Sequence, residues 1–167
     1  MEYSESRPLE MLFLPFLTPS HMVPLFQIAR LFAARGQHVT FVTTPANASN
    51  LRLTTDLDAA SGHPISLHII PFPSKEVGLP DGLESFTSIT NNFSRREQLF
   101  QAFLLLRPKI EELILRRRPD CIVADMFYPW TAYLGIPRLQ FHVSSLFHLC
   151  VEDANGSPNS PDRKSVV

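Results

Sequence analysis

Residues 11–44 place a strand, a helix and a second strand in close succession, and this order constrains the fold more than any other part of the chain. Residues 11–17 are apolar without interruption, which is typical of a strand buried on both faces. Residues 25–32 then carry apolar side chains at helical spacing, and residues 38–44 are rich in β-branched residues and phenylalanine. Two strands joined by a helix predict a parallel pair with a right-handed crossover.

Ser20, Pro24 and Gly36 predict the ends of this first helix. Ser20 can cap its start, Pro24 is tolerated in a first turn, and Gly36 suits the position just past its end. A moderate pattern over residues 46–60 favours a second helix, and residues 66–71 favour a third strand.

A long loop rich in proline and glycine is expected over residues 71–82. Ser94 and Glu97 match a capping box, which predicts the start of a long helix that Pro108 kinks or splits. Residues 121–124 and 138–143 predict the fourth and fifth strands. The fold class expected from this order is α/β, with a parallel sheet flanked by helices.

Composition excludes several classes of protein. The 167 residues suit one domain, and a net charge of −1 favours neither nucleic acid nor an anionic membrane as a partner. Cys121 and Cys150 belong to no close Cys/His cluster, so we expect no metal site. The N-terminal residues are polar and acidic, and no apolar run reaches the length of a membrane span. We therefore expect a cytoplasmic protein without membrane insertion.

His21 and Asp125 are the candidate catalytic residues, because each lies where a predicted strand ends. Open α/β sheets bind ligands at that edge. The positive end of a helix disfavours imidazolium, so His21 could accept a proton, and a carboxylate such as Asp125 could orient its ring. Alternatively, His21 is a surface or capping residue and Asp125 caps the helix that follows it.

Further candidates lie near these two positions. Phe16, Met126, Phe127 and Trp130 could line an apolar pocket, or belong to the core. Ser144 follows the fifth strand and could donate to a phosphate or sugar, or belong to a simple turn. Asp56 and Asp58 form an acid-x-acid pair that could hold a divalent metal, although the surrounding polar helix favours a plain surface.

Taken together, these segments resemble the N-terminal half of the plant UDP-dependent glycosyltransferases of family 1. Those enzymes have the GT-B architecture, in which two Rossmann-like domains face a cleft. The resemblance therefore implies an acceptor-binding Rossmann-like domain over residues 8–150 and the absence of a C-terminal donor-binding domain. The polar composition of residues 151–167 separately predicts a disordered tail. The matching segments are residues 13–16, 21–24, 29–36, 39–45, 78–82, 118–130 and 134–138.

The resemblance also implies a role for each candidate residue. His21 would be the base that deprotonates an acceptor hydroxyl, and Asp125 would orient it. The oxygen would attack the anomeric carbon of a UDP-sugar with inversion, which requires no cofactor beyond that co-substrate. Ser20 and Ser144 would approach the donor. Phe16, Met126, Phe127 and Trp130 would join His21 in holding a small phenolic or flavonoid-type acceptor of plant secondary metabolism.

Two departures from the family pattern limit these expectations. A chain without the donor-binding domain should bind a UDP-sugar weakly if at all, so we expect this fragment to be inactive alone. In addition, about four residues are missing between Ala132 and Leu134, roughly one helical turn directly behind Asp125. An alternative is a non-catalytic protein that binds small phenolic ligands or associates with a full-length relative.

Overall fold

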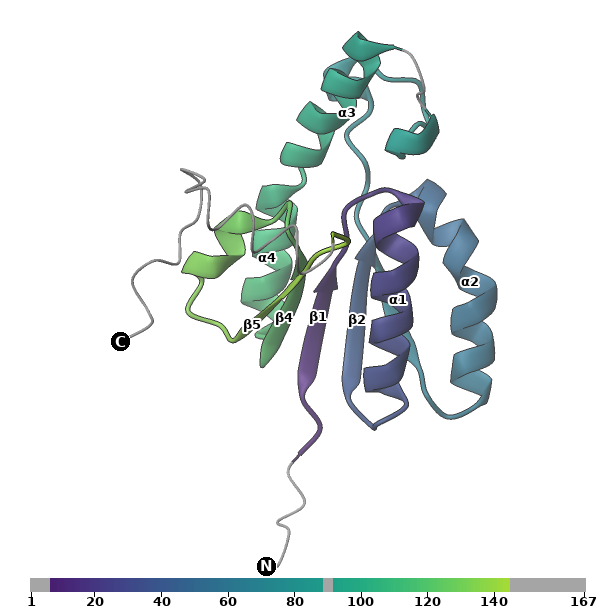
Figure 1. The fold of residues 1–167 in the computed structure, drawn as a ribbon, viewed down its shortest axis with the longest axis vertical. Coiled ribbons are helices and arrows are strands. Elements are labelled where there is room, and N and C mark those ends of the chain that lie inside the picture. Colours follow the sequence, from purple (N-terminus) through teal and green to yellow (C-terminus); the bar gives the residue numbers. More distant parts are fainter. Residues whose placement is uncertain (1–6, 89–91, 145–167) are drawn as a thin grey trace, which may run out of the picture.

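The computed structural model of this chain describes residues 7–88 and 92–144, so the predicted tail over residues 151–167 lies outside the described residues. One parallel sheet of five strands forms its centre, in the order β3-β2-β1-β4-β5 (Figure 1). The predicted α/β fold class is therefore confirmed. The strands are β1 (Glu10–Leu14), β2 (His38–Thr43), β3 (Ile65–Ile69), β4 (Cys121–Asp125) and β5 (Arg138–Phe141).

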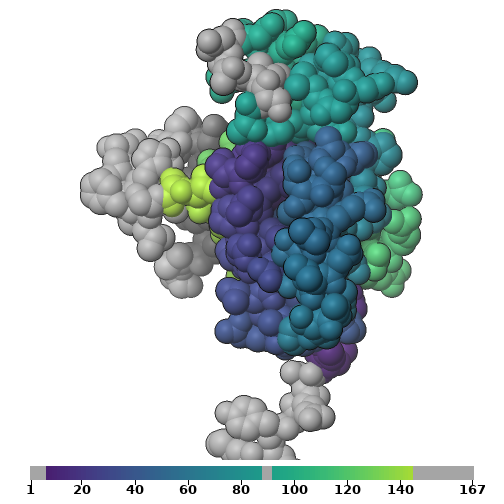
Figure 2. Space-filling model, turned by 90° about the vertical axis from the view of Figure 1, so that its right-hand side faces the viewer, coloured from purple at the N-terminus to yellow at the C-terminus, as the bar shows by residue number. Residues whose placement is uncertain are grey.

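Helices cover both faces of this sheet. The helices α1 (Pro19–Ala33) and α2 (Pro45–Ala60) lie on one face, while α4 (Arg107–Arg117) lies on the other (Figure 1). The helix α3 (Phe93–Leu104) rises beyond the carboxyl edge of the sheet, and Figure 2 shows it above the surface that α1 and α2 form. No helix among the described residues is long and apolar enough to cross a membrane.

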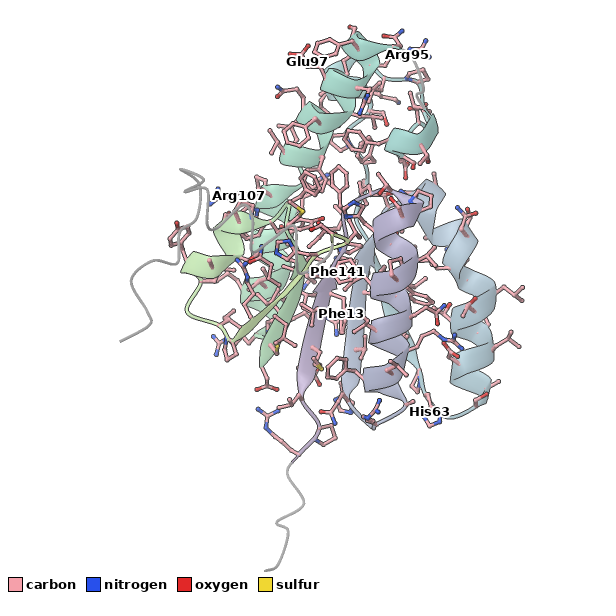
Figure 3. The ribbon with its side chains drawn as sticks, viewed as in Figure 1. Phe13, His63, Arg95, Glu97, Arg107 and Phe141 are labelled. Atoms are coloured by element: carbon pink, nitrogen blue, oxygen red, sulfur yellow. The ribbon has the colours of Figure 1, made fainter. Side chains whose placement is uncertain are left out.

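Aromatic packing fills the space between the sheet and α1. Phe13, the fourth residue of β1 (labelled in Figure 3), is fully buried. Its ring lies 6.0 Å from that of Phe32 and 6.4 Å from that of Phe41. Phe26 of α1 meets Phe41 edge to face at 5.2 Å. The uninterrupted apolar run of the first strand is explained by this burial, because β1 has a strand on each side and helices on each face.

The start of α1 differs from the prediction. Thr18 occupies the N-cap position in an extended conformation and Pro19 is the first helical residue, so Ser20 does not cap this helix. The fixed φ of Pro19 suits that first position, where no N–H is needed. Pro24 consequently lies inside α1 rather than in its first turn.

Two other boundaries also change. Asn92 caps α3 by accepting a hydrogen bond from the backbone N of Arg95 at 3.1 Å, so the predicted capping box at Ser94 is wrong. Pro108 does split the long apolar pattern, because α3 ends at Leu104 and α4 places this proline in its first turn, where it interrupts no hydrogen bond.

The connection from β4 to β5 contains the short 3₁₀ helix η3 (Pro129–Tyr133) instead of an α-helix. Two further 3₁₀ turns, η1 (Lys75–Val77) and η2 (Phe86–Ser88), lie in the loop between β3 and α3. The predicted fifth strand is also shorter than expected and ends at Phe141. The connection where we expect about four residues fewer than in the family pattern is therefore a 3₁₀ turn, and the strand that follows it is retained.

An ion pair joins the segments that enter the two central strands. The two terminal guanidinium nitrogens of Arg7, Nη2 and Nη1, donate to the carboxylate of Asp120 at 2.6 and 2.9 Å, and the backbone N of Glu10 donates to it at 2.9 Å. The Arg7 hydrogen bond is the main cause that lowers the pKa of Asp120, followed by the hydrogen bond from Glu10. This pair fixes the amino ends of β1 and β4 to each other.

Truncating a buried ring should cost far more stability than truncating an exposed apolar side chain. We expect Phe41→Ala to lower the free energy of unfolding by about 3–5 kcal/mol, because it leaves a cavity beside Phe13. Leu53, on the outer surface of α2, is 73% exposed. Leu53→Ala should therefore change the free energy of unfolding by no more than about 0.5 kcal/mol. Urea unfolding measures both values, and similar losses in the two variants would contradict this assignment of the core.

The stabilising effect of Asp120 should depend on pH in one direction. Its pKa is lower in the folded chain than in the unfolded chain, so its stabilisation is present above the unfolded pKa of about 3.9 and is lost as the pH falls through the folded pKa. We expect Asp120→Asn to be less stable than the wild type at pH 7, with a difference that shrinks below about pH 4. Urea unfolding across this range tests the sign, and a constant difference would contradict it.

Candidate functional site

The pairing of β1 with β4 brings the candidate residues to one place. The register runs from Met11 opposite Cys121 to Leu14 opposite Ala124, so both strands end together at the carboxyl edge. Strand order also reverses direction between β1 and β4, which makes this the topological switch point of the sheet. His21 projects from the first turn of α1, and Asp125 is the last residue of β4.

His21 and Asp125 form a direct hydrogen bond. The Nδ1 atom of His21 lies 2.8 Å from Oδ2 of Asp125, and the side chain of Asp125 is fully buried while that of His21 is 13% exposed. The other carboxylate oxygen, Oδ1, accepts from the backbone N of Phe127 at 3.3 Å. Because a carboxylate can only accept, Nδ1 carries a proton, and in its neutral form the ring keeps a lone pair on Nε2.

Neither residue caps the helix beside it. The N-cap of α1 is Thr18, and the N-cap of η3 is Tyr128. Asp125 instead divides its oxygens between a histidine ring and a nearby backbone amide. This arrangement holds the imidazole in one tautomer and one orientation, which is what a proton acceptor requires.

Phe16 and Phe127 lie next to the histidine ring, both on the same side of it. Their own rings stack, with centroids 4.0 Å apart and an angle of 23° between the planes. The imidazole lies 5.4 Å from Phe16 and 5.8 Å from Phe127. These two predicted pocket residues therefore form an apolar wall directly beside the candidate base.

Two residues of this wall were not predicted. Phe86, in η2, lies 4.8 Å from Phe16, and Phe103, in α3, meets Phe16 edge to face at 5.1 Å. The helical spacing of apolar residues places Phe103 on the buried face of its helix, but this pattern does not indicate which ring Phe103 contacts. Phe86 lies in an irregular segment, where no periodicity reveals the direction of a side chain.

Met126 and Trp130 lie in the connection that follows β4. Met126 is 39% exposed, between Asp125 and Phe127. Trp130 packs against Tyr128, with ring centroids 6.4 Å apart, and under the guanidinium of Arg107 at 5.0 Å. Figure 3 shows Arg107 where α3 gives way to α4, so Trp130 lies on that side of the site. A role for both in binding stays a prediction.

The two serines predicted for donor binding lie on different elements. Ser20 is exposed on the first turn of α1, and its hydroxyl lies 3.1 Å from that of Thr18. Ser144 is partly exposed and is the last residue that the structure describes. The role of both serines in donor binding therefore also stays a prediction.

The acid pair of α2, Asp56 and Asp58, does not form a metal site. Asp58 accepts two hydrogen bonds from the guanidinium of Arg30, at 2.6 and 2.7 Å, while Asp56 is exposed. Within residues 7–88 and 92–144, no three histidine, cysteine or acidic side chains lie close enough together to hold a metal ion.

A buried tyrosine ties the two strand ends together. The hydroxyl of Tyr128 donates to the backbone O of Pro15 at 2.9 Å. Burial is the main cause that raises the pKa of Tyr128, and the charge of Asp125 raises it further. The hydroxyl therefore stays protonated as a donor, which fixes the loop that carries Phe16 against the loop that carries Phe127.

The buried pair should show a larger interaction energy than a similar exposed pair. His38 and Glu10 offer the control, because Nδ1 of His38 lies 2.6 Å from Oε1 of Glu10, with side chains 62% and 42% exposed. A double-mutant cycle of His21→Ala and Asp125→Ala should give a coupling of about 1.5–3 kcal/mol in unfolding free energy. The same cycle on the exposed pair should give less than about 1 kcal/mol. Additive losses at the buried pair would contradict its hydrogen bond.

Sequence comparison identifies relatives over most of this chain, although no family model matches it. The chain is 47% identical over 161 residues to UDP-glucosyl transferase 73CC6 of Saponaria officinalis, which covers 94% of this chain and 32% of the relative. It is 45% identical over 170 residues to solanidine UDP-glucose glucosyltransferase 1 of Solanum tuberosum, covering 95% and 35%. The chain thus spans about a third of the length of these relatives.

Solved structures show the same arrangement of elements. UGT73P12 of Glycyrrhiza uralensis, complexed with glycyrrhetinic acid 3-O-monoglucuronide, matches with a TM-score of 0.72 and 38% identity over 80% of this chain and 28% of that one. UGT89C1 of Arabidopsis thaliana matches with a TM-score of 0.73 and 26% identity over 95% and 39%. Both comparisons agree on the sheet and the helices that flank it.

Proposed function

We propose that this chain, a homologue of plant UDP-glycosyltransferases over about a third of their length, forms the acceptor-binding and base-bearing part of such an enzyme. The observation that carries the proposal is the bond of 2.8 Å between His21 and the buried Asp125, beside the stacked rings of Phe16 and Phe127. A proton acceptor and an apolar wall lie together at the edge where open α/β sheets bind ligands.

In the proposed reaction, the acceptor hydroxyl gives its proton to Nε2 of His21 while its oxygen attacks the anomeric carbon of the sugar. The bond from that carbon to UDP breaks on the opposite side, so the configuration inverts and UDP leaves as the anion. Asp125 stabilises the imidazolium that forms, because its carboxylate stays bonded to Nδ1. The UDP-sugar is the co-substrate, with glucose as the proposed sugar, and no cofactor enters the reaction.

The proposed acceptor is a small phenolic molecule of the flavonoid kind. A flat ring suits the wall of Phe16 and Phe127, where offset stacking favours aromatic ligands. One relative, from Nicotiana tabacum, is named for scopoletin, and another, from Solanum tuberosum, is named for solanidine. A structure of UGT89C1 is a complex with quercetin. Ser20 and Ser144 are the residues proposed to approach the donor.

A second candidate is binding without catalysis, and exposed apolar side chains on α3 favour it. Phe93 is 82% exposed, and Phe100 and Leu104 are 39% and 49% exposed. Apolar surface of this kind often marks an interaction site. Association with a full-length relative and a cytoplasmic location stay predictions of the sequence.

Activity and binding assays test the first candidate. We expect the purified 167-residue chain, given UDP-glucose with quercetin or scopoletin, to show little or no transfer, because these residues span about a third of the length of a relative. Chromatography of the products measures this, and turnover near the usual enzyme range of about 1–1,000 per second would contradict the expected inactivity.

Any transfer that is detected should depend on His21. His21→Ala should then abolish it, while His38→Ala should retain it, because His38 lies at the opposite edge of the sheet and bonds Glu10. Equal rates in the wild type and His21→Ala would remove His21 from the reaction. Quercetin binding, measured by fluorescence titration, is expected of the first candidate even without turnover, and its absence would contradict the proposed acceptor.

A further inference from the structure

Glu84 is a buried acid in the loop between β3 and α3, and it has no role in the site described above. Its side chain is only 6% exposed, and no lysine, arginine or histidine forms an ion pair with it among the residues that the structure describes. A buried carboxylate without a base is costly unless hydrogen bonds satisfy it. The partners of Glu84 therefore show what its burial achieves.

The first partner is the start of α2. Pro45 is the first residue of that helix and has no N–H, and the N-cap Thr44 makes no capping hydrogen bond with its side chain. The next amide, that of Ala46, instead donates to Oε2 of Glu84 at 2.8 Å. Glu84 thus caps α2 from 38 positions away in the sequence, at the end of the helix that favours negative charge.

A second contact holds the backbone of Glu84. The side-chain nitrogen of Asn47, itself buried in the first turn of α2, lies 3.3 Å from the carbonyl oxygen of Glu84 and 2.8 Å from Oγ1 of Thr44. Side chain and main chain of Glu84 are therefore both fixed to the same helix end. The loop cannot slide along α2 without breaking both contacts.

The segment that Glu84 fixes leads directly to the aromatic wall. Phe86 follows two residues later, and its ring lies 4.8 Å from Phe16. Phe16 in turn stacks on Phe127 and lies 5.4 Å from the ring of His21. These contacts, joined by the short chain segment from Glu84 to Phe86, thus connect the start of α2 with the candidate base.

We propose that Glu84 is a positioning residue for this site: its bond to the start of α2 holds Phe86 against Phe16 and so fixes the apolar wall beside His21. The inference rests on the proposed function only for the nature of the ligand that the wall receives. The position of Phe86 against Phe16 can be measured without any ligand.

Three variants test the contact. Glu84→Ala removes the acceptor, and Glu84→Gln keeps an oxygen that can accept from the amide of Ala46. Glu76→Ala is the matched control, because Glu76 is an exposed acid of the same loop, in η1. Nuclear Overhauser effects between the rings of Phe86 and Phe16 report on the wall, and hydrogen exchange of the Ala46 amide reports on the cap.

In Glu84→Ala we expect the Phe86–Phe16 cross-peaks to disappear and the Ala46 amide to exchange about tenfold faster, as the loss of a hydrogen bond to a charged group implies. Glu84→Gln should restore the cross-peaks, and Glu76→Ala should match the wild type. A folded Glu84→Ala variant with intact cross-peaks and unchanged exchange would overturn the proposal. Equal losses in the Ala and Gln variants would overturn it as well.

Glu84→Asp decides the question if Glu84→Ala does not fold. Its side chain is one methylene shorter, so its carboxylate should fail to reach the amide of Ala46 and the variant should lose the cross-peaks. Intact cross-peaks would overturn the proposal.

The affinity for quercetin is the separate readout, and it should fall about tenfold in the variants that lose the cross-peaks. If the cross-peaks respond as expected but the wild type does not bind quercetin, the positioning role stands and the proposed acceptor fails.

Discussion

The parallel pairing of β1 with β4 is the constraint on which the rest of the structure depends. β1 lies at the centre of the sheet with a strand on each side, so its apolar residues are buried and its path is fixed. The pairing ends both strands at the same edge, which brings His21 and Asp125 together although 104 positions separate them. The hydrogen bond from Tyr128 to Pro15 then holds the loops beyond the two strands in the same relation.

Burial keeps Asp125 hydrogen-bonded to His21. A carboxylate with no exposed surface cannot exchange its partners for water, so its two oxygens stay with the imidazole and the amide of Phe127. The stacked rings of Phe16 and Phe127 lie beside the imidazole and form the proposed wall for a flat ligand. The bond to Asp125 thus orients the base, and these rings shape the space beside it.

Sequence patterns predicted the elements better than the contacts between them. Periodicity indicated the strands and helices because burial repeats along each element, and the ends of two apolar strands indicated His21 and Asp125. The caps at Ser20 and Ser94 were wrong because several adjacent polar residues could serve, and the backbone geometry selected Thr18 and Asn92 instead. A cap supplied through a distant loop leaves no local pattern at all, which is why the role of Glu84 was not predicted.

The shortened connection after β4 shows which contacts hold the site. About a turn of helix was expected to be missing behind Asp125, and the structure has only the 3₁₀ helix η3 there. Asp125 nevertheless stays at the end of β4, within 2.8 Å of His21. Its position depends on the ladder to β1 and on bonds to His21 and Phe127, none of which comes from the connecting helix. A deletion in that helix can therefore leave the pair intact, because the sheet, and not the crossover, carries the acid to the base.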